Sequence, residues 1–127
     1  MSAGLILVVD DHPVNLELLL HLLTGHGYEV MTAADAPAAQ AAIRLRRPGL
    51  ILMDLQLPGM DGFELTRRLK ADAATAAIPV IAVTSYAMSV DKLSAMQAGC
   101  DAYVTKPIDT RTLPALIARF MAARPPA

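Results

Sequence analysis

The sequence predicts an α/β fold, a doubly wound parallel sheet of five strands with helices on both faces. Two observations predict it. Short apolar runs and stretches of helical periodicity alternate five times along the 127 residues. The apolar runs also lack the polar alternation of a half-exposed strand, which is typical of strands buried on both faces. Parallel strands joined by right-handed helical crossovers place helices on both sides of the sheet.

Five apolar runs of four or five residues are the predicted strands, and most of them are rich in β-branched residues. The second run is followed only by Ala34 and Asp35, which suits a strand at the edge of the sheet. The fifth run is the weakest. In chain order the runs are Leu5–Val9, Val30–Ala33, Leu50–Met53, Val80–Val83 and Ala102–Thr105.

After each run, apolar residues spaced three or four apart predict a helix with one face toward the core. We expect Gly25 or Gly27 to end the first helix, Pro48 to follow the second and Gly99 to end the fourth. The expected apolar stripes are Leu16, Leu19, Leu20 and Leu23, then Ala38, Ala41, Ala42 and Leu45, then Phe63, Leu65 and Leu69, then Leu93, Met96 and Ala98, and last Leu113, Leu116, Ile117 and Phe120.

The composition is that of one folded domain, and it excludes several classes of protein. The chain is 54% hydrophobic and 18% charged, a balance that excludes disorder. Its net charge is −1 and it has no clustered basic face, which argues against direct nucleic-acid binding. The apolar runs are too short for membrane insertion, and no signal peptide is recognisable. We therefore expect a soluble, cytoplasmic single domain over residues 1–127, with its one cysteine, Cys100, buried and reduced.

Polar side chains follow four of the five predicted strands. Asp10 and Asp11 follow the first strand, Asp54 the third, Thr84 the fourth and Lys106 the fifth. Ligands of open α/β sheets bind outside the carboxyl ends of the strands, so we expect these groups to meet at one edge. The sequence thus predicts a site of three carboxylates, one hydroxyl and one ammonium group.

An aspartate after a strand is also a common N-cap of the next helix, and this alternative applies to Asp10 and Asp11. It does not apply to Asp54, which lies too far ahead of the helix marked by Phe63. Asp61 is the better candidate for capping that helix. Asp54 therefore calls for another explanation.

A divalent cation explains the acids best, because three converging carboxylates repel one another unless a cation lies between them. Carboxylate oxygens, backbone carbonyls and water are the ligands of Mg²⁺. With Mg²⁺ bound, Lys106 and Thr84 would complete a set of groups able to form an aspartyl phosphate on one carboxylate. For His12 we expect the role of a loop residue beside the acids, and ligation of the metal stays open.

Four stretches of the chain resemble the receiver domain of two-component response regulators, the CheY-like fold. They are VVDDHPVN at Val8–Asn15, LILMDLQLPGMDG at Leu50–Gly62, PVIAVTSYA at Pro79–Ala87 and AGCDAYVTKPID at Ala98–Asp109. Within the family the chain is similar to DivK-like single-domain regulators and to receivers attached to hybrid histidine kinases. The resemblance implies the flavodoxin/CheY-like strand order 2-1-3-4-5.

The resemblance also implies roles for individual residues. Asp54 would be the phosphoacceptor, and Thr84 and Tyr103 would be the switch residues, with Lys106 in the place of the family's lysine. Mg²⁺ would be bound by Asp11, by Asp54, by the backbone carbonyl of Gln56 and, through water, by Asp10. Gln56 and Tyr86 would line the approach to the phosphoryl group, and Pro107 would follow a cis peptide bond.

A receiver of this kind would be a switch whose only chemistry is self-phosphorylation from a phosphodonor and autodephosphorylation. A histidine kinase or a histidine phosphotransfer protein would supply the phosphoryl group. The effect would reach a downstream protein target through the face of the fourth helix, fifth strand and fifth helix, and the chain would be a monomer or a phosphorylation-dependent dimer. We expect this face to include Met88, Lys92, Met96, Tyr103 and the region of Arg111.

Three alternatives remain at this point. The same receiver would also serve as the C-terminal module of a hybrid histidine kinase in a phosphorelay. A haloacid-dehalogenase-like phosphatase uses similar groups, but its nucleophile follows the first strand in a D-x-D pattern, whereas Asp54 follows the third. A flavodoxin-like cofactor carrier would need a Ser/Thr/Gly-rich phosphate loop where this chain has Asp10 and Asp11.

Overall fold

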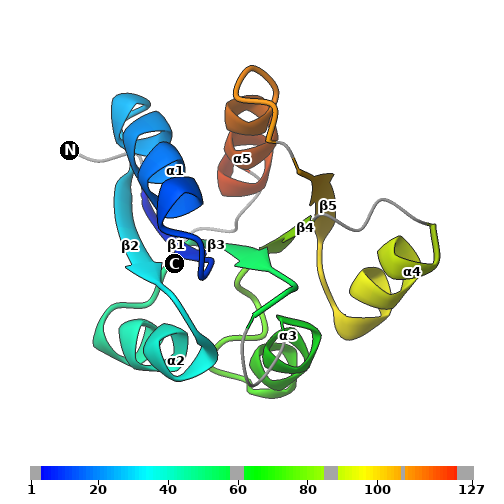
Figure 1. The fold of residues 1–127 in the computed structure, drawn as a ribbon. Coiled ribbons are helices and arrows are strands. Elements are labelled where there is room, and N and C mark those ends of the chain that lie inside the picture. Colours follow the sequence, from blue (N-terminus) through cyan, green and yellow to red (C-terminus); the bar gives the residue numbers. More distant parts are fainter. Residues whose placement is uncertain (1–3, 58–61, 85–88, 107, 123–127) are drawn as a thin grey trace.

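The computed structural model has a five-stranded parallel sheet between two layers of helices, as the sequence predicts (Figure 1). It describes residues 4–57, 62–84, 89–106 and 108–122. The strands lie in the order β2-β1-β3-β4-β5, and every neighbouring pair is parallel. They are β1 Leu5–Val9, β2 Glu29–Ala33, β3 Leu50–Asp54, β4 Val80–Thr84 and β5 Ala102–Thr105, so β2, β3 and β4 are each one residue longer than predicted.

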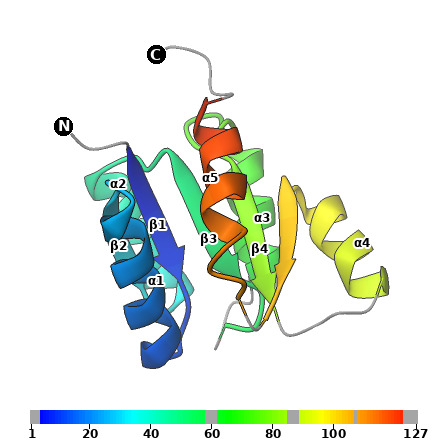
Figure 2. The ribbon, with the colours of Figure 1, turned by 90° about the horizontal axis from the view of Figure 1, so that it is seen from above.

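Five helices cover the two faces of the sheet. They are α1 Pro13–Gly25, α2 Ala36–Leu45, α3 Gly62–Ala71, α4 Ser89–Ala98 and α5 Leu113–Ala122. Helices α1 and α5 pack on one face, and α2, α3 and α4 pack on the other (Figures 1 and 2). No helix within the described ranges is long and apolar enough to cross a membrane.

The sheet has a hydrophobic core on each side, which explains the unbroken apolar runs. Consecutive side chains of a strand point to opposite faces. In β1, Ile6 and Val8 belong to the core under α1 and α5, whereas Leu7 and Val9 belong to the core under α2, α3 and α4. All four are at most 1% exposed, so no position of this stretch could be polar without a partner.

The predicted apolar stripe of α2 is wrong in part: Ala42 packs against the core as predicted, but the other three residues do not. Leu45 is 80% exposed, and Ala38 and Ala41 face solvent. In a helix so rich in alanine, the spacing of methyl groups does not select one face. The larger side chain of the helix decides the orientation instead, and α2 buries Ala36, Ala39 and Ile43.

The predicted stripes of α4 and α1 are also wrong in part. In α4, Ala98 is buried as predicted, but the two larger residues are not. Leu93 is 58% exposed and Met96 is 44% exposed, while the small residues Ala95 and Ala98 face the core. Because α4 packs through alanines, its large apolar side chains lie on the surface. In α1 the predicted residue Leu20 is 37% exposed, although Leu19 and Leu23 are buried as expected.

Candidate functional site

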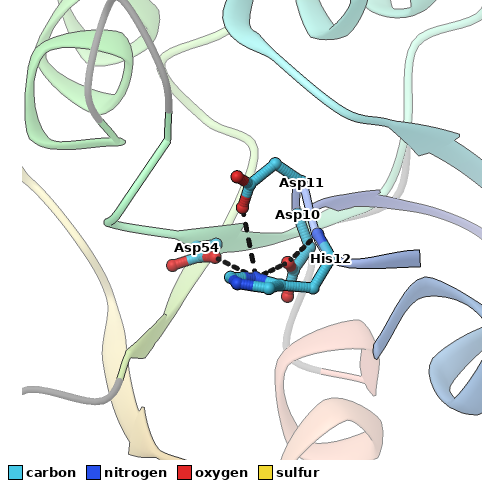
Figure 3. A group of neighbouring side chains, drawn as sticks. All are labelled: Asp10, Asp11, His12 and Asp54. Carbon is cyan, nitrogen blue, oxygen red and sulfur yellow. Dashed lines mark hydrogen bonds and ion pairs between the residues drawn. The ribbon is translucent and has the colours of Figure 1, made fainter. Parts of the chain in front are cut away.

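The carboxyl ends of β1 and β3 bring the predicted acids together. These strands are neighbours, with Val9 opposite Met53, so the residues that follow lie side by side. Asp10, Asp11, His12 and Asp54 each place one ligand atom within 4.8 Å of the others, and their side chains converge in Figure 3. The predicted convergence of the three carboxylates is confirmed.

Asp54 is the last residue of β3, and its side chain is only 1% exposed. Its Oδ1 atom accepts a hydrogen bond of 2.9 Å from the backbone N–H of Gln56. Burial is the largest effect on the Asp54 carboxyl and raises its pKa above the ordinary value, and the negative charge of Asp10 raises the pKa further. The hydrogen bond from the Gln56 N–H and the positive charge of Lys106 lower the pKa, but only in part. The ionised carboxylate therefore lies where a further positive group would stabilise it.

Lys106 provides the one ammonium group found near the acids in the described chain. Its Nζ atom lies 3.2 Å from Oδ2 of Asp54 and 3.3 Å from Oδ2 of Asp10, and the side chain is 14% exposed. Lys106 thus joins the two most buried carboxylates, as its position after β5 predicts. One cation facing three acids leaves the site with an excess of negative charge.

Asp10 does not cap the helix that follows it. The N-cap of α1 is His12, which makes no side-chain capping bond, and α1 begins at Pro13. Instead Asp10 Oδ1 accepts a hydrogen bond of 2.8 Å from the backbone N–H of His12. The capping alternative for Asp10 and Asp11 is therefore wrong, whereas Asp35 does cap α2 by accepting from the N–H of Ala38.

Asp11 carries the observation that best fits a cation site. Its Oδ1 atom is buried and accepts no hydrogen bond from any residue that the structure describes. It lies 3.2 Å from Nδ1 of His12. A buried carboxylate oxygen without a hydrogen bond is costly. The donor set of three carboxylates therefore fits a divalent cation, as hard cations prefer oxygen ligands.

His12 turns its ring toward the acids, although the side chain is 60% exposed (Figure 3). Its Nδ1 atom lies 3.0 Å from Asp10 Oδ1 and 3.9 Å from Asp54 Oδ2. The side chain of His12 therefore belongs to the acidic cluster. The sequence left two roles open for it, a loop residue beside the acids or a metal ligand. Its place directly after the acid pair was the only signal in the sequence.

Gly62 supports the backbone of Asp54, and the sequence analysis missed this. Its N–H donates to the carbonyl of Leu55 over 3.2 Å. A Cβ atom at Gly62 would lie 2.6 Å from Cα of Leu55 and would overlap the carbonyl oxygen of Asp54. Only glycine permits this close approach. The Asp-Gly pair at the start of α3 was the signal available.

The other predicted residues are described in part. Thr84 is the last residue of β4, opposite Thr105, and its side chain is not described. Tyr103 is partly buried and packs against the core under α2, α3 and α4. In the expected output face, Met96 is exposed and the Arg111 side chain is 90% exposed. Asp61, Tyr86, Met88, Pro107 and the side chain of Lys92 lie outside what the structure describes.

The fold and the site together define a class of small α/β proteins. Its members have a parallel sheet of this strand order, with acids and a lysine at the carboxyl edge that can hold a cation. The family model of the response regulator receiver domain matches residues 6–118, and the chain belongs to this family. Receiver domains generally act as signalling switches and not as separate enzymes. Membership of this family excludes the phosphatase and the flavodoxin-like cofactor carrier as alternatives.

Individual proteins support this assignment. The chain is 42% identical to protein PilH of Pseudomonas aeruginosa over 108 residues, which are 85% of this chain and 89% of that protein. It is 43% identical to the polar-differentiation response regulator DivK of Brucella anthropi over 103 residues, which are 81% of this chain and 84% of that protein.

A solved structure gives the same result. The receiver domain of the sensor histidine kinase PA1611 from Pseudomonas aeruginosa superposes with a TM-score of 0.87 at 33% identity. The match covers 94% of this chain and 98% of the other, and that crystal structure has a magnesium ion coordinated in its active site cleft.

Proposed function

We propose that the chain is a phosphoacceptor switch in which Asp54 takes a phosphoryl group from a histidine kinase or a histidine phosphotransfer protein. The observation that carries the proposal is the setting of Asp54. Its carboxylate is buried, is oriented by the N–H of Gln56 and lies 3.2 Å from the ammonium group of Lys106. Asp10 and Asp11 lie beside it.

In the proposed reaction, an oxygen of the Asp54 carboxylate attacks the phosphorus atom and forms the new oxygen–phosphorus bond. The bond between phosphorus and the donor breaks, and the leaving group keeps the electron pair. When the donor is phosphohistidine, this is the phosphorus–nitrogen bond. No general base is needed, because an ionised carboxylate is already a nucleophile. Lys106 would neutralise charge on the phosphoryl oxygens, and Thr84, at the end of the adjacent strand β4, would donate its hydroxyl.

The cation of this proposal is Mg²⁺. Asp11, Asp54 and the backbone carbonyl of Gln56 would hold it, and Asp10 would contribute through water. When bound, Mg²⁺ supplies positive charge to the acids and to the phosphoryl oxygens. The buried Asp11 oxygen that accepts no hydrogen bond from the described residues supports this assignment.

The switch would couple the site to the surface of α4, β5 and α5. Phosphorylation adds negative charge and acceptor oxygens at Asp54. Thr84 would move toward the phosphoryl group, and Tyr103 would rotate into the vacated space, shifting a two-state equilibrium. The exposed side chains of Leu93 and Met96 would then lie on the face that a downstream protein target reads.

Gln56 and Tyr86 would line the approach to the phosphoryl group. We assign to the Tyr86 ring the role of hindering the attacking water and so of prolonging the aspartyl phosphate. Tyr86→Ala is expected to speed dephosphorylation, followed as loss of phosphoryl mass after the donor is removed. An unchanged rate in the variant would contradict this role.

The proposed unit is a single cytoplasmic receiver over residues 1–127, a monomer or a phosphorylation-dependent dimer. A phosphorelay is a second context for the same chemistry, with the chain as the C-terminal receiver of a hybrid histidine kinase. The similarity to the receiver domain of the sensor histidine kinase PA1611 supports this second context. Both contexts require Asp54 to accept the phosphoryl group.

Intact-protein mass spectrometry tests the proposal. The chain is incubated with acetyl phosphate and Mg²⁺, and wild type is expected to gain the mass of one phosphoryl group. Asp54→Asn should gain none, whereas Asp72→Asn, a change in an exposed turn, should behave like wild type. A wild-type chain without added mass, or equal labelling of Asp54→Asn, would refute the proposal.

A further inference from the structure

We infer that His12 is a nitrogen donor to the metal site, so that the site takes first-row transition-metal dications such as Co²⁺ and Ni²⁺ in preference to Mg²⁺. The inference rests on the proposed function, because it concerns the same acidic site. It adds an imidazole to a site that the family assignment fills with oxygen ligands alone.

The distance from His12 to Asp11 is that between two ligands of one metal ion. Two donors at about 2.1 Å from a common metal lie roughly 3.0–3.4 Å apart at angles between octahedral and tetrahedral. His12 Nδ1 lies 3.2 Å from Oδ1 of Asp11, the carboxylate assigned to the metal. It also lies at hydrogen-bond distance, 3.0 Å, from Oδ1 of Asp10, which would contribute through water. Asp54 Oδ2, at 3.9 Å from the same nitrogen, lies outside this range. All of the donor atoms lie within 4.8 Å of one another.

The backbone directs His12 toward the acids. Its N–H donates to Asp10 Oδ1, which ties the residue to the buried end of β1, and Pro13 starts α1 directly after it. The ring is turned toward the carboxylates in Figure 3, even though its side chain is 60% exposed. Because the ring is so exposed, it would adjust to a metal ion without repacking the core.

The donor chemistry predicts the preference. Carboxylates, carbonyls and water suit Mg²⁺, whereas imidazole suits Zn²⁺, Ni²⁺ and similar ions. Oδ1 of Asp11 lies 3.2 Å from the His12 nitrogen and accepts no hydrogen bond from the described residues, so it is available to bind the same ion. A nitrogen donor beside three carboxylates therefore raises the affinity for transition-metal ions more than the affinity for Mg²⁺.

Calorimetric titration of the tag-free chain with Co²⁺ and separately with Mg²⁺ tests the inference. The readout is the ratio of the two affinities in wild type, in His12→Asn and in the matched control His21→Asn, a change at an exposed histidine of α1. We expect His12→Asn to lower the ratio of Co²⁺ to Mg²⁺ affinity by about tenfold or more, as loss of a metal-site contact does. His21→Asn should keep the wild-type ratio.

A second readout follows the rings directly. Nitrogen-15 NMR of the imidazoles should show the resonances of His12, and not those of His21 or His26, shifted by Zn²⁺ and hardly affected by Mg²⁺. If His12→Asn leaves the affinity ratio unchanged, or if Zn²⁺ does not shift the His12 nitrogens, the inference is wrong. Thermal unfolding followed by circular dichroism verifies that the variants are folded.

The outcomes for the inference and for the proposed function are separate. A wild-type chain that is phosphorylated with Mg²⁺ but shows no effect of His12 on the ratio refutes the inference and leaves the proposed function standing. A chain that binds Co²⁺ through His12 but gains no phosphoryl group from acetyl phosphate refutes the proposed function alone.

Discussion

The carboxyl group of Asp54 is held where a negative charge is costly. Burial raises its pKa, and the hydrogen bond from Gln56 and the charge of Lys106 offset this only in part. A carboxylate in this setting gains from any added cation. The environment of this single residue therefore links the fold to the proposed cation and to the proposed phosphoryl transfer.

The raised pKa of Asp54 predicts a dependence of stability on pH. The folded protein binds a proton at this residue more tightly than the unfolded chain does, whose carboxyl has a pKa near the ordinary value of 3.8. The protonated Asp54 carboxyl therefore stabilises the fold fully below pH 3.8, and this stabilisation is lost as the pH rises through the raised pKa of the folded protein. At neutral pH without metal, Asp54→Asn should therefore be more stable than wild type.

Urea unfolding of the metal-free chain measures this effect. The advantage of Asp54→Asn should be largest near neutral pH and should shrink as the pH falls through the raised pKa of Asp54. Asp72→Asn, at an exposed position, serves as the control. A lower urea midpoint for Asp54→Asn than for wild type at neutral pH would show that the ionised Asp54 carboxylate does not destabilise the metal-free fold.

Gly62 gives a second prediction for a single residue. A methyl group there would press on Cα of Leu55 and on the carbonyl of Asp54, so Gly62→Ala should destabilise the protein by about 1–3 kcal/mol. Urea unfolding measures the loss. Gly25→Ala is the matched control, because a Cβ at Gly25 meets no atom within 4 Å. Equal stability of the two variants would show that Gly62 does not need to be glycine.

At the scale of elements, strands were easier to predict than helix faces. A strand buried on both sides must be apolar throughout, so the run Leu50–Met53 allows one interpretation. A helix such as α2 carries small apolar residues on several faces, and which face is buried depends on the neighbours. The sequence pattern therefore predicts a core position for Leu45, whereas its side chain is 80% exposed.

The ends of the elements opposite the acidic site are joined by a polar network that the sequence did not predict. Asp101 Oδ2, just before β5, accepts from the N–H of Val80 over 2.8 Å and from Nζ of Lys70 over 3.0 Å. Lys70 also donates to the carbonyl of Ile78 over 2.8 Å. The residues come from separate parts of the chain, so no local spacing signals their contact.

This network predicts a loss of stability when its acceptor is removed. Val80 is fully buried, and Asp101→Ala would leave its N–H without this acceptor, at a cost of about 1–3 kcal/mol. Asp101→Asn keeps an acceptor oxygen and loses only a part-exposed ion pair, which is worth little. Urea unfolding should therefore rank Asp101→Asn well above Asp101→Ala, and the reverse order would exclude this role.

At the scale of the whole molecule, the topology decided how much of the site could be predicted. The predicted doubly wound sheet places the ends of β1, β3, β4 and β5 at one edge, so the meeting of Asp10, Asp54 and Lys106 followed from the order of elements. The direction of the His12 ring and the fit of Gly62 against Asp54 did not follow, because both depend on contacts at the scale of single atoms.

The proposed switch depends on Asp54 as the residue that receives the phosphoryl group. The most direct measurement is to phosphorylate the wild-type chain with acetyl phosphate and Mg²⁺, reduce the acyl phosphate with borohydride and map the altered residue by peptide mass spectrometry. Conversion of the aspartate at position 54 alone is expected. Conversion at Asp10 or Asp11 in place of Asp54, or no conversion at all, would contradict this role of Asp54.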